Sequence, residues 1–169
     1  STDDAPSSNA GQTIPVGTWN SSVLAWKNVE EFTIDFSSWP FEETVPSTDR
    51  MSDTFTLTVN GRAIGVNTSR DFTSNGLLFN TKGDYVEFPA IPGKKLKEVQ
   101  VYTSGNGLKG TVVDASGNLM GGPEYQLYGG NYYTFIVPKS EINTKYRYQV
   151  TTTNASPRIL TIKLTYAGD

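Results

Sequence analysis

Carboxylates are the only side chains of this sequence whose type and spacing leave catalysis open. The 169 residues contain no histidine and no cysteine, which removes the Ser-His-Asp triad, the HExxH zinc site and the thiolate nucleophile. A glycosidase needs two carboxyl groups roughly 5 to 9.5 Å apart, one of them with a raised pKa. Glu30, Glu31 and Asp35 form one group, and Glu42 and Glu43 another. Both groups fit solvated faces or loops better, so we expect no enzyme.

Residues 105–110, Gly-Asn-Gly-Leu-Lys-Gly, match the GxGxxG dinucleotide fingerprint letter for letter. That fingerprint binds a pyrophosphate where a strand precedes it and a helix begins within it. Residues 111–114 are instead predicted to form a strand that ends at a turn. We therefore expect no cofactor, and we predict that the glycines form a hairpin loop.

Asp114, Ser116 and Asn118 place three oxygen ligands at alternate positions, which could begin a calcium loop. The EF-hand pattern fails because the sixth position is not glycine and the twelfth is not glutamate. A β-turn with side-chain-to-backbone hydrogen bonds is the favoured interpretation. Asp84 is likewise predicted to be a turn residue rather than a ligand, so no metal site is expected.

Aromatic side chains give a better functional lead. Sugars present flat C–H faces that stack on Trp and Tyr rings, while Asn, Asp, Gln and Arg bind their hydroxyls. Seven aromatic residues are predicted to lie in loops or on polar strand faces: Trp19, Trp26, Trp39, Tyr102, Tyr125, Tyr128 and Tyr132. Packing in the core or at an edge is the alternative for each of them.

From these residues we predict one ligand site at a loop end of the domain. Trp26 and Tyr128 would stack on a glycan, and Asn131 or Arg70 would donate hydrogen bonds to it. Binding would be independent of calcium. It would also be weak, because an open site buries little surface.

Short alternating strands must position this site. From residue 83 to residue 166, runs of alternating apolar and polar residues are separated by turn residues, as is typical of half-buried antiparallel strands. The clearest runs are 85–88, 99–102, 133–137, 146–150 and 160–164. We predict an all-β fold, an antiparallel two-sheet β-sandwich.

Several local features refine this prediction. Asn60-Gly61 predicts a two-residue hairpin turn, because both positions must take positive φ. Residues 146–166 are predicted to form a hairpin that buries Tyr146, Tyr148, Leu160 and Leu164. Residues 23–31 are predicted to form a short helix, and the two prolines within residues 38–47 predict a crossing loop.

Composition bounds the domain and its partners. Residues 1–17 are small, polar and acidic and are predicted to be a flexible leader, with one β-sandwich domain over residues 18–169. The net charge is −3 and no basic stripe is present, so nucleic acid is not an expected partner. No apolar run approaches the ~20 residues of a membrane-spanning helix. We expect a monomer.

The sequence also resembles a known group of domains. Residues 83–99, 114–118, 143–150 and 159–166, with the opening strand and Trp-Pro-Phe step at 32–41, are similar to domains of Bacteroidetes surface lipoproteins. The likeness covers about residues 30–167 and lies in strands and turns, not in catalytic residues.

This resemblance implies a galactose-binding-like jelly roll, export, and an outer-membrane tether through a lipidated cysteine. Residues 1–4 are similar to the stretch that follows such a cysteine, which is itself not in this sequence. A glycan-capturing surface module is thus one expected function. A structural or interaction domain of an exported lipoprotein, with no small ligand, is the other.

Overall fold

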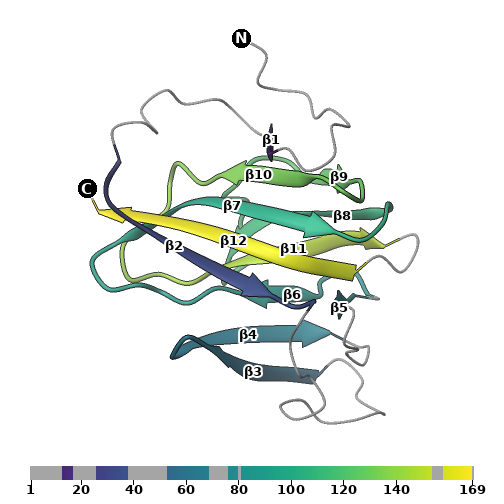
Figure 1. Ribbon diagram of the computed structural model, residues 1–169, viewed down its shortest axis with the longest axis horizontal. Helices are drawn as coiled ribbons and strands as arrows, with labels where there is room; N and C mark the ends of the chain where they lie inside the picture. The colour runs from purple at the N-terminus through teal and green to yellow at the C-terminus, as the bar shows by residue number, and fades with distance from the viewer. Residues whose placement is uncertain are drawn as a thin grey trace.

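The computed structural model describes residues 13–16, 26–37, 53–68, 76–79, 81–153 and 158–168, and these form two sheets packed face to face (Figure 1). Sheet A contains, in spatial order, β1 (Thr13–Val16), β10 (Tyr132–Ile136), β7 (Lys95–Thr103), β12 (Arg158–Gly168) and β2 (Lys27–Asp35), with β5 (Leu77–Leu78) also paired to β12. Sheet B contains β3 (Asp53–Val59), β4 (Arg62–Thr68), β6 (Tyr85–Glu87), β11 (Tyr146–Thr153), β8 (Leu108–Asp114) and β9 (Tyr125–Leu127).

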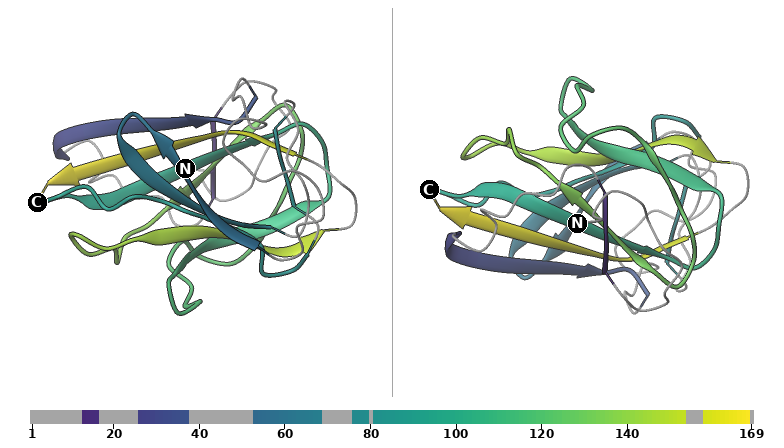
Figure 2. Two further views of the ribbon diagram at one scale, coloured as in Figure 1. Left: turned by 90° about the horizontal axis from the view of Figure 1, so that it is seen from below. Right: turned by 90° about the horizontal axis from the view of Figure 1, so that it is seen from above.

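The two sheets form the layers of a β-sandwich, seen from its two sides in Figure 2. From β5 onward the chain repeatedly crosses between the sheets: β5, β7, β10 and β12 belong to sheet A, and β6, β8, β9 and β11 to sheet B. Such crossing is typical of a jelly roll. The predicted all-β two-sheet fold is confirmed, and no helix occurs in the described part of the chain. Every described strand pairing is antiparallel except that of β1 with β10.

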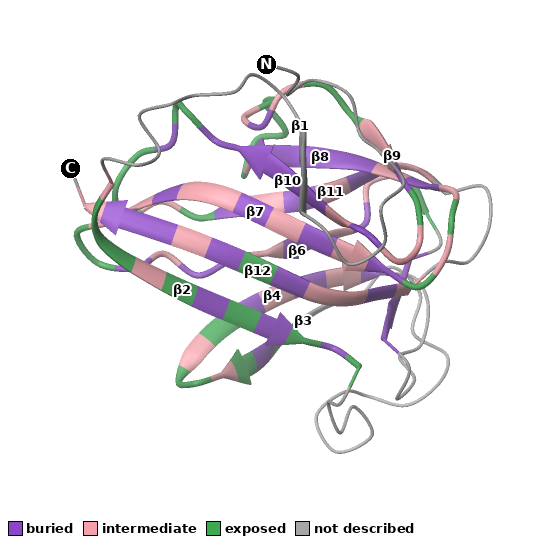
Figure 3. Cartoon of the chain, turned by 45° about the horizontal axis from the view of Figure 1, so that its top comes forward, coloured by how far each residue is buried: buried purple, intermediate pink, exposed green. Residues whose placement is uncertain are grey.

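Strand alternation places one face of each sheet in a shared core. Along β2 and β12 the buried positions alternate with more exposed ones (Figure 3). The largest fully buried side chains come from strands of both sheets and from the residues that follow β2, β5 and β6: Tyr133, Tyr148, Tyr166, Phe36, Phe79, Phe88, Phe135, Ile34, Leu57, Ile64 and Leu77. Aromatic residues therefore supply much of the core volume, and their polar ends must be accommodated there.

Several local predictions are confirmed. Asn60 and Gly61 take φ of 48° and 78° and join β3 to β4, with Val59 opposite Arg62. Asp84 is buried at the turn before β6, where it accepts a hydrogen bond from the backbone of Thr81 at 3.0 Å. The 105–110 segment leads into strand β8 rather than a helix.

One predicted helix and one predicted strand pairing are wrong. The predicted helix over residues 23–31 is contradicted from Lys27 onward, because strand β2 begins there. Pairing with β12 along its length determines this conformation, against the weak helical pattern. The predicted 146–166 hairpin is also wrong, because β11 lies in sheet B and β12 in sheet A. The apolar sides of β11 and β12 therefore point into the core from opposite sheets, and the two strands are not paired with each other.

The buried positions of these two strands are mostly as predicted. Tyr146, Tyr148 and Leu164 are buried, but Leu160 is only half-buried. A register shift between Ile159 and Thr161 adds a residue to β12 and breaks the alternation there. Ile159 takes the buried position instead.

The connection at residues 104–107 also differs from the prediction. It is a passage from β7 in sheet A to β8 in sheet B, and not a hairpin loop. Strand β1 lies within the range predicted as a leader and pairs with β10, with Thr13 opposite Tyr132. The 38–47 loop, Trp19 and Trp39 lie outside the described residues.

Candidate functional site

The outer face of sheet A carries a ladder of aromatic and polar side chains. Along β10, β7 and β12, successive residues point alternately into the core and to the outer face. The strand register places the outward-pointing residues side by side. One row across the strands is Asp35, Thr161, Tyr102 and Tyr132, and the next is Thr33, Lys163, Gln100 and Thr134. We call Tyr102, Tyr132, Gln100, Thr134 and Lys163 the tyrosine face; within it Thr134 is buried, Lys163 is exposed and the other three are half-buried.

Two tyrosines lie directly opposite each other on this face, where β7 ends and β10 begins. The ring centroids of Tyr102 and Tyr132 are 4.9 Å apart, with an angle of 36° between the ring planes. Both residues are half-buried, so each ring packs against its neighbours and keeps part of its surface in water. Cross-strand aromatic pairs of this kind stabilise a sheet by about 0.2–1 kcal/mol.

Hydrogen-bonding groups surround the pair. The Nζ atom of Lys163 lies 4.6 Å from the centroid of the Tyr132 ring. The Gln100 amide donates to Oγ1 of Thr134 at 3.3 Å and lies 3.5 Å from a carboxylate oxygen of Glu98. Lys163 is exposed, and exposed cation–π contacts are worth about 0.5–1 kcal/mol. The ammonium can therefore move aside for a ligand or bind one.

Glu98 lies in the third row of the same face, with Thr165 between it and Glu31. Burial raises the pKa of the Glu98 carboxyl, and the nearby Glu31 carboxylate raises it further. The carboxylates of Glu98 and Glu31, on the outer face of sheet A, thus repel each other and any negatively charged ligand.

This shift predicts a pH-dependent stability. Between the ordinary pKa of a glutamate and the raised pKa of Glu98, the folded protein holds a proton that the unfolded chain has lost. The free energy of unfolding therefore falls as pH rises through this window and stays lowered above it. Replacing Glu98 by Gln should stabilise the protein at neutral pH and have less effect near about pH 4.

Urea unfolding of wild type and Glu98→Gln at both pH values measures this difference. Glu31→Gln is the companion variant, since it removes only the smaller cause and should give a smaller gain in the same direction. Equal pH dependence in wild type and Glu98→Gln would contradict the assignment.

The structure separates the two aromatic residues predicted to stack on a ligand. Trp26 precedes β2, whose first residue Lys27 is opposite Gly168 at the end of β12. Tyr128 precedes β10, whose first residue Tyr132 is opposite Tyr102 near the other end of sheet A. Trp26 and Tyr128 therefore lie at opposite ends of the sandwich, and the predicted joint site is not formed.

The remaining predicted ligand residues divide in the same way. Tyr128 is 44% exposed, and its ring centroid lies 6.5 Å from that of the core residue Tyr133. Asn131 is only 3% exposed and its Oδ1 atom has no hydrogen-bond partner among the described residues. Its side chain is not presented to a ligand from outside. Arg70 lies outside the described residues.

Sequence reasoning selected Tyr102 and Tyr132 as aromatic candidates but missed Gln100, Thr134 and Lys163. Strand alternation alone marks these three as outward-facing. Their grouping depends on β10, β7 and β12 being neighbours, which no local pattern indicates.

The turn after β8 has the predicted hydrogen bonds. One carboxylate oxygen of Asp114 accepts from the backbone N–H groups of Ser116 and Asn118, both at 2.9 Å, and the other accepts from the Asn118 amide at 3.0 Å. Hydrogen bonds from Asn118, and then from Ser116 and Gly117, lower the pKa of Asp114. Within the described ranges, no three Asp or Glu side chains gather closely enough to hold a metal ion.

Comparisons with known proteins add little to this geometry. No family model and no curated protein matches the sequence. Among solved structures, the chain is similar to the crystal structure of Podospora anserina GH26-CBM35 beta-(1,4)-mannanase, with 16% sequence identity and a TM-score of 0.42. The match covers 82% of this chain and 28% of the mannanase chain. No described segment is a helix that could span a membrane.

Proposed function

We propose that this protein is a non-catalytic module that binds a glycan on the tyrosine face of sheet A. The observation that carries the proposal is the half-buried pair Tyr102 and Tyr132, whose rings lie together beside the side chains of Gln100 and Lys163. Tyrosine rings offer a flat apolar surface for the C–H face of a sugar. The amide and the ammonium offer hydrogen bonds to its hydroxyls.

The extent of the face suits a short oligosaccharide. Four neighbouring strands, β10, β7, β12 and β2, carry the two rows of outward residues. At about 4.8 Å between strands, a row extends over about 14 Å. A chain lying along the first row would meet Tyr132 and Tyr102 and then the hydroxyl of Thr161.

Charge favours a neutral glycan over an acidic one. The three rows paired across β2, β12 and β7 carry Glu31, Asp35 and Glu98 against the ammonium of Lys163, and Lys95 and Lys97 lie beyond these rows on β7. An acidic polysaccharide would bring its carboxylates close to the three acidic residues, and such like-charge contacts discriminate between ligands. Affinity should be tens of micromolar to millimolar, roughly −6 to −4 kcal/mol, because the site is open.

A glycan array of neutral and acidic polysaccharides, followed by calorimetry, tests the proposal. Tyr132→Ala and Tyr102→Ala should each weaken binding about tenfold, since each removes a stacking surface worth about 1.4 kcal/mol. Tyr85→Ala is the matched control, because Tyr85 is a half-buried strand tyrosine of sheet B, where it lies under the Arg147 guanidinium.

One result would reject the proposed site and another the proposed function. Loss of binding in Tyr85→Ala with full binding in Tyr132→Ala would move the site to sheet B. Absence of binding by the folded wild type to every glycan would instead favour the structural or interaction domain of an exported lipoprotein.

We also propose export and attachment at the bacterial cell surface through a lipid anchor. The support is the resemblance of residues 30–167 to surface lipoprotein domains and the Ser- and Asp-rich composition of residues 1–4. Protease digestion of intact cells, with a cytoplasmic protein as control, should remove the domain. Protection of the domain in intact cells would contradict surface exposure.

A further inference from the structure

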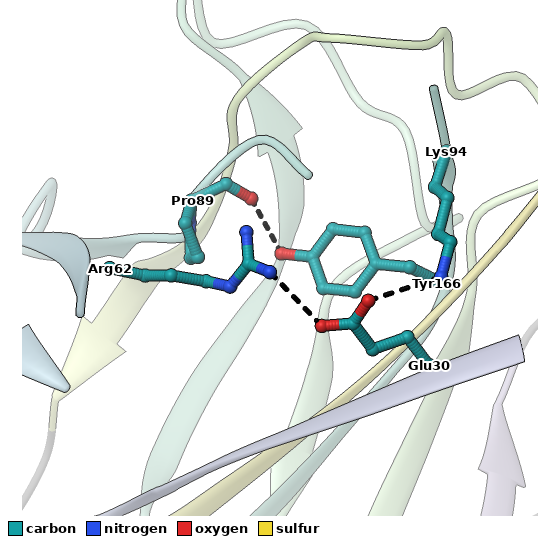
Figure 4. Close-up of polar contacts among 5 residues, drawn as sticks. All are labelled: Glu30, Arg62, Pro89, Lys94 and Tyr166. Atoms are coloured by element: carbon teal, nitrogen blue, oxygen red, sulfur yellow. Dashed lines mark hydrogen bonds and ion pairs between the residues drawn. The ribbon is translucent and has the colours of Figure 1, made fainter. Parts of the chain in front are cut away.

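A second cluster of charged residues lies at the end of the sandwich opposite to Tyr102 and Tyr132. Glu30 of β2 in sheet A binds Arg62 of β4 in sheet B, with Nη2 3.1 Å from Oε2 (Figure 4). Its other carboxylate oxygen lies 3.1 Å from Nζ of Lys94, which precedes β7. A single carboxylate thus holds two cations from separate segments, and it joins the two sheets.

The backbone at Pro89, beside these ions, accepts a hydrogen bond from a buried tyrosine. The Tyr166 hydroxyl donates a hydrogen bond to the carbonyl oxygen of Pro89 at 2.6 Å, and Tyr166 is buried at the end of β12. In Figure 4 the Arg62 guanidinium lies between Pro89 and Glu30, with one terminal nitrogen directed away from the carboxylate. The arginine therefore has donors left over after its ion pair.

An open pocket of about 350 Å³ adjoins this arginine. Its lining is formed by the hairpin tip between β3 and β4, the segment after β6, and the residue before β11: Gly61, Arg62, Ala63, Pro89, Ala90, Pro92 and Lys145. The volume is at the lower end of the range for ligand sites, about 300–1,000 Å³. A ligand of the size of one sugar ring would fit within it.

The charges around the pocket are unbalanced. Arg62 and Lys145 line it and Lys94 is close by, whereas Glu30 is the one carboxylate in the cluster that contacts these cations among the described residues. Lys145 is exposed and makes no ion pair with a described residue. Counted over the described residues, the surroundings of the pocket are thus locally positive in a chain of net charge −3.

We propose that this pocket binds a compact ligand of one-ring size that carries an oxyanion, either a carboxylate or a sulfate ester. The free donors of Arg62 and the ammonium of Lys145 would pair with the oxyanion. Pro89, Ala90 and Pro92 would contact the apolar side of the ring. The site lies apart from the tyrosine face and has the opposite charge preference, so it does not depend on the proposed function.

Nuclear magnetic resonance of ¹⁵N-labelled protein tests the site with four probes: D-glucuronate, glucose 6-sulfate, glucose and inorganic sulfate. We expect the amide signals of Gly61, Ala63, Ala90 and Lys145 to shift with glucuronate, glucose 6-sulfate or both, and not with glucose. The two charged sugars show whether the pocket prefers a carboxylate or a sulfate ester. Shifts should shrink as salt is added, because an exposed ion pair is screened.

Lys145→Gln should weaken binding of the charged sugars about three- to fivefold, the effect of one exposed ion pair. Lys82→Gln is the matched control, because Lys82 is an exposed lysine in the turn before β6 and outside the pocket. Thermal unfolding of both variants confirms that the fold is kept. Tyr132→Ala should leave these shifts unchanged, which separates the site from the tyrosine face.

Three outcomes would overturn the proposal. Equal shifts with glucose would show that the oxyanion is not recognised. Shifts with inorganic sulfate but with neither charged sugar would reduce the site to an adventitious ion only. Equal affinity of Lys145→Gln and wild type for the charged sugars would show that Lys145 does not bind the oxyanion. The proposed recognition by charge would then be wrong.

Discussion

Replacing Gly110 by alanine is expected to lower the free energy of unfolding by about 3 kcal/mol, at the upper end of the usual cost of overpacking a core. Gly110 lies in β8, opposite Val150 of β11, and the ring of Tyr148 covers it. A Cβ atom added there would lie 2.5 Å from Cζ of Tyr148 and 2.6 Å from the carbonyl oxygen of Gln149. Tyr148 is fully buried, so neither neighbour can move away cheaply.

Urea unfolding of Gly110→Ala measures this loss, with Gly65→Ala as the matched control. Gly65 also lies in a strand of sheet B, but its nearest neighbour to an added Cβ atom is Cβ of Glu87 at 3.2 Å. That variant should change stability by less than about 1 kcal/mol. Equal effects of the two substitutions would show that the Tyr148 contact is not the cause.

The Tyr148 hydroxyl adds a second test of the same contact. It is buried and has no hydrogen-bond partner in the described structure, and burial raises its pKa, with Glu124 raising it further. Tyr148→Phe removes the unpaired oxygen and should be close to neutral. In that background, Gly110→Ala should cost less than it does in wild type.

The second large effect is expected at Leu164. Its side chain is fully buried, and its neighbours across sheet A are Val99 of β7 and Phe32 of β2. Replacing Leu164 by alanine should cost about 2–5 kcal/mol, through lost burial and the cavity that remains. Chemical denaturation gives the value directly.

Lys163→Ala is the control for this substitution, because Lys163 is the adjacent residue of β12 and points to solvent. Its loss should stay below about 1 kcal/mol, since it removes only an exposed cation–π contact. A cost below about 1 kcal/mol for Leu164→Ala would show that the inner face of β12 has been misassigned.

Local patterns in the sequence predicted the elements of this fold well, because alternation and turn chemistry act over a few residues. The Asn60-Gly61 hairpin and the Asp114 turn depend only on adjacent residues, and both are present. The pairing of strands far apart in the sequence cannot be predicted from such local patterns. The apolar faces of β11 and β12 are compatible with one hairpin or with two facing sheets, and the sequence pattern does not distinguish these arrangements.

The candidate site was harder to predict for the same reason. Tyr102 and Tyr132 could be selected by residue type, but their contact requires β7 and β10 to be neighbours in sheet A. Trp26 and Tyr128 were grouped by type alone, and the register places them at opposite ends. Leu160 shows the limit of alternation itself, because one register shift in β12 exchanges it with Ile159.

The position of β12 between β7 and β2 has a consequence for the order in which the chain can fold. This strand lies between β7 and β2, although it follows both in the sequence. During synthesis, β2 and β7 cannot gain their shared partner before residues 158–168 leave the ribosome. Until then two unpaired strand edges stay available to other chains. Sheet A is therefore completed only after β12 has been synthesised, and exposed strand edges before that point favour aggregation.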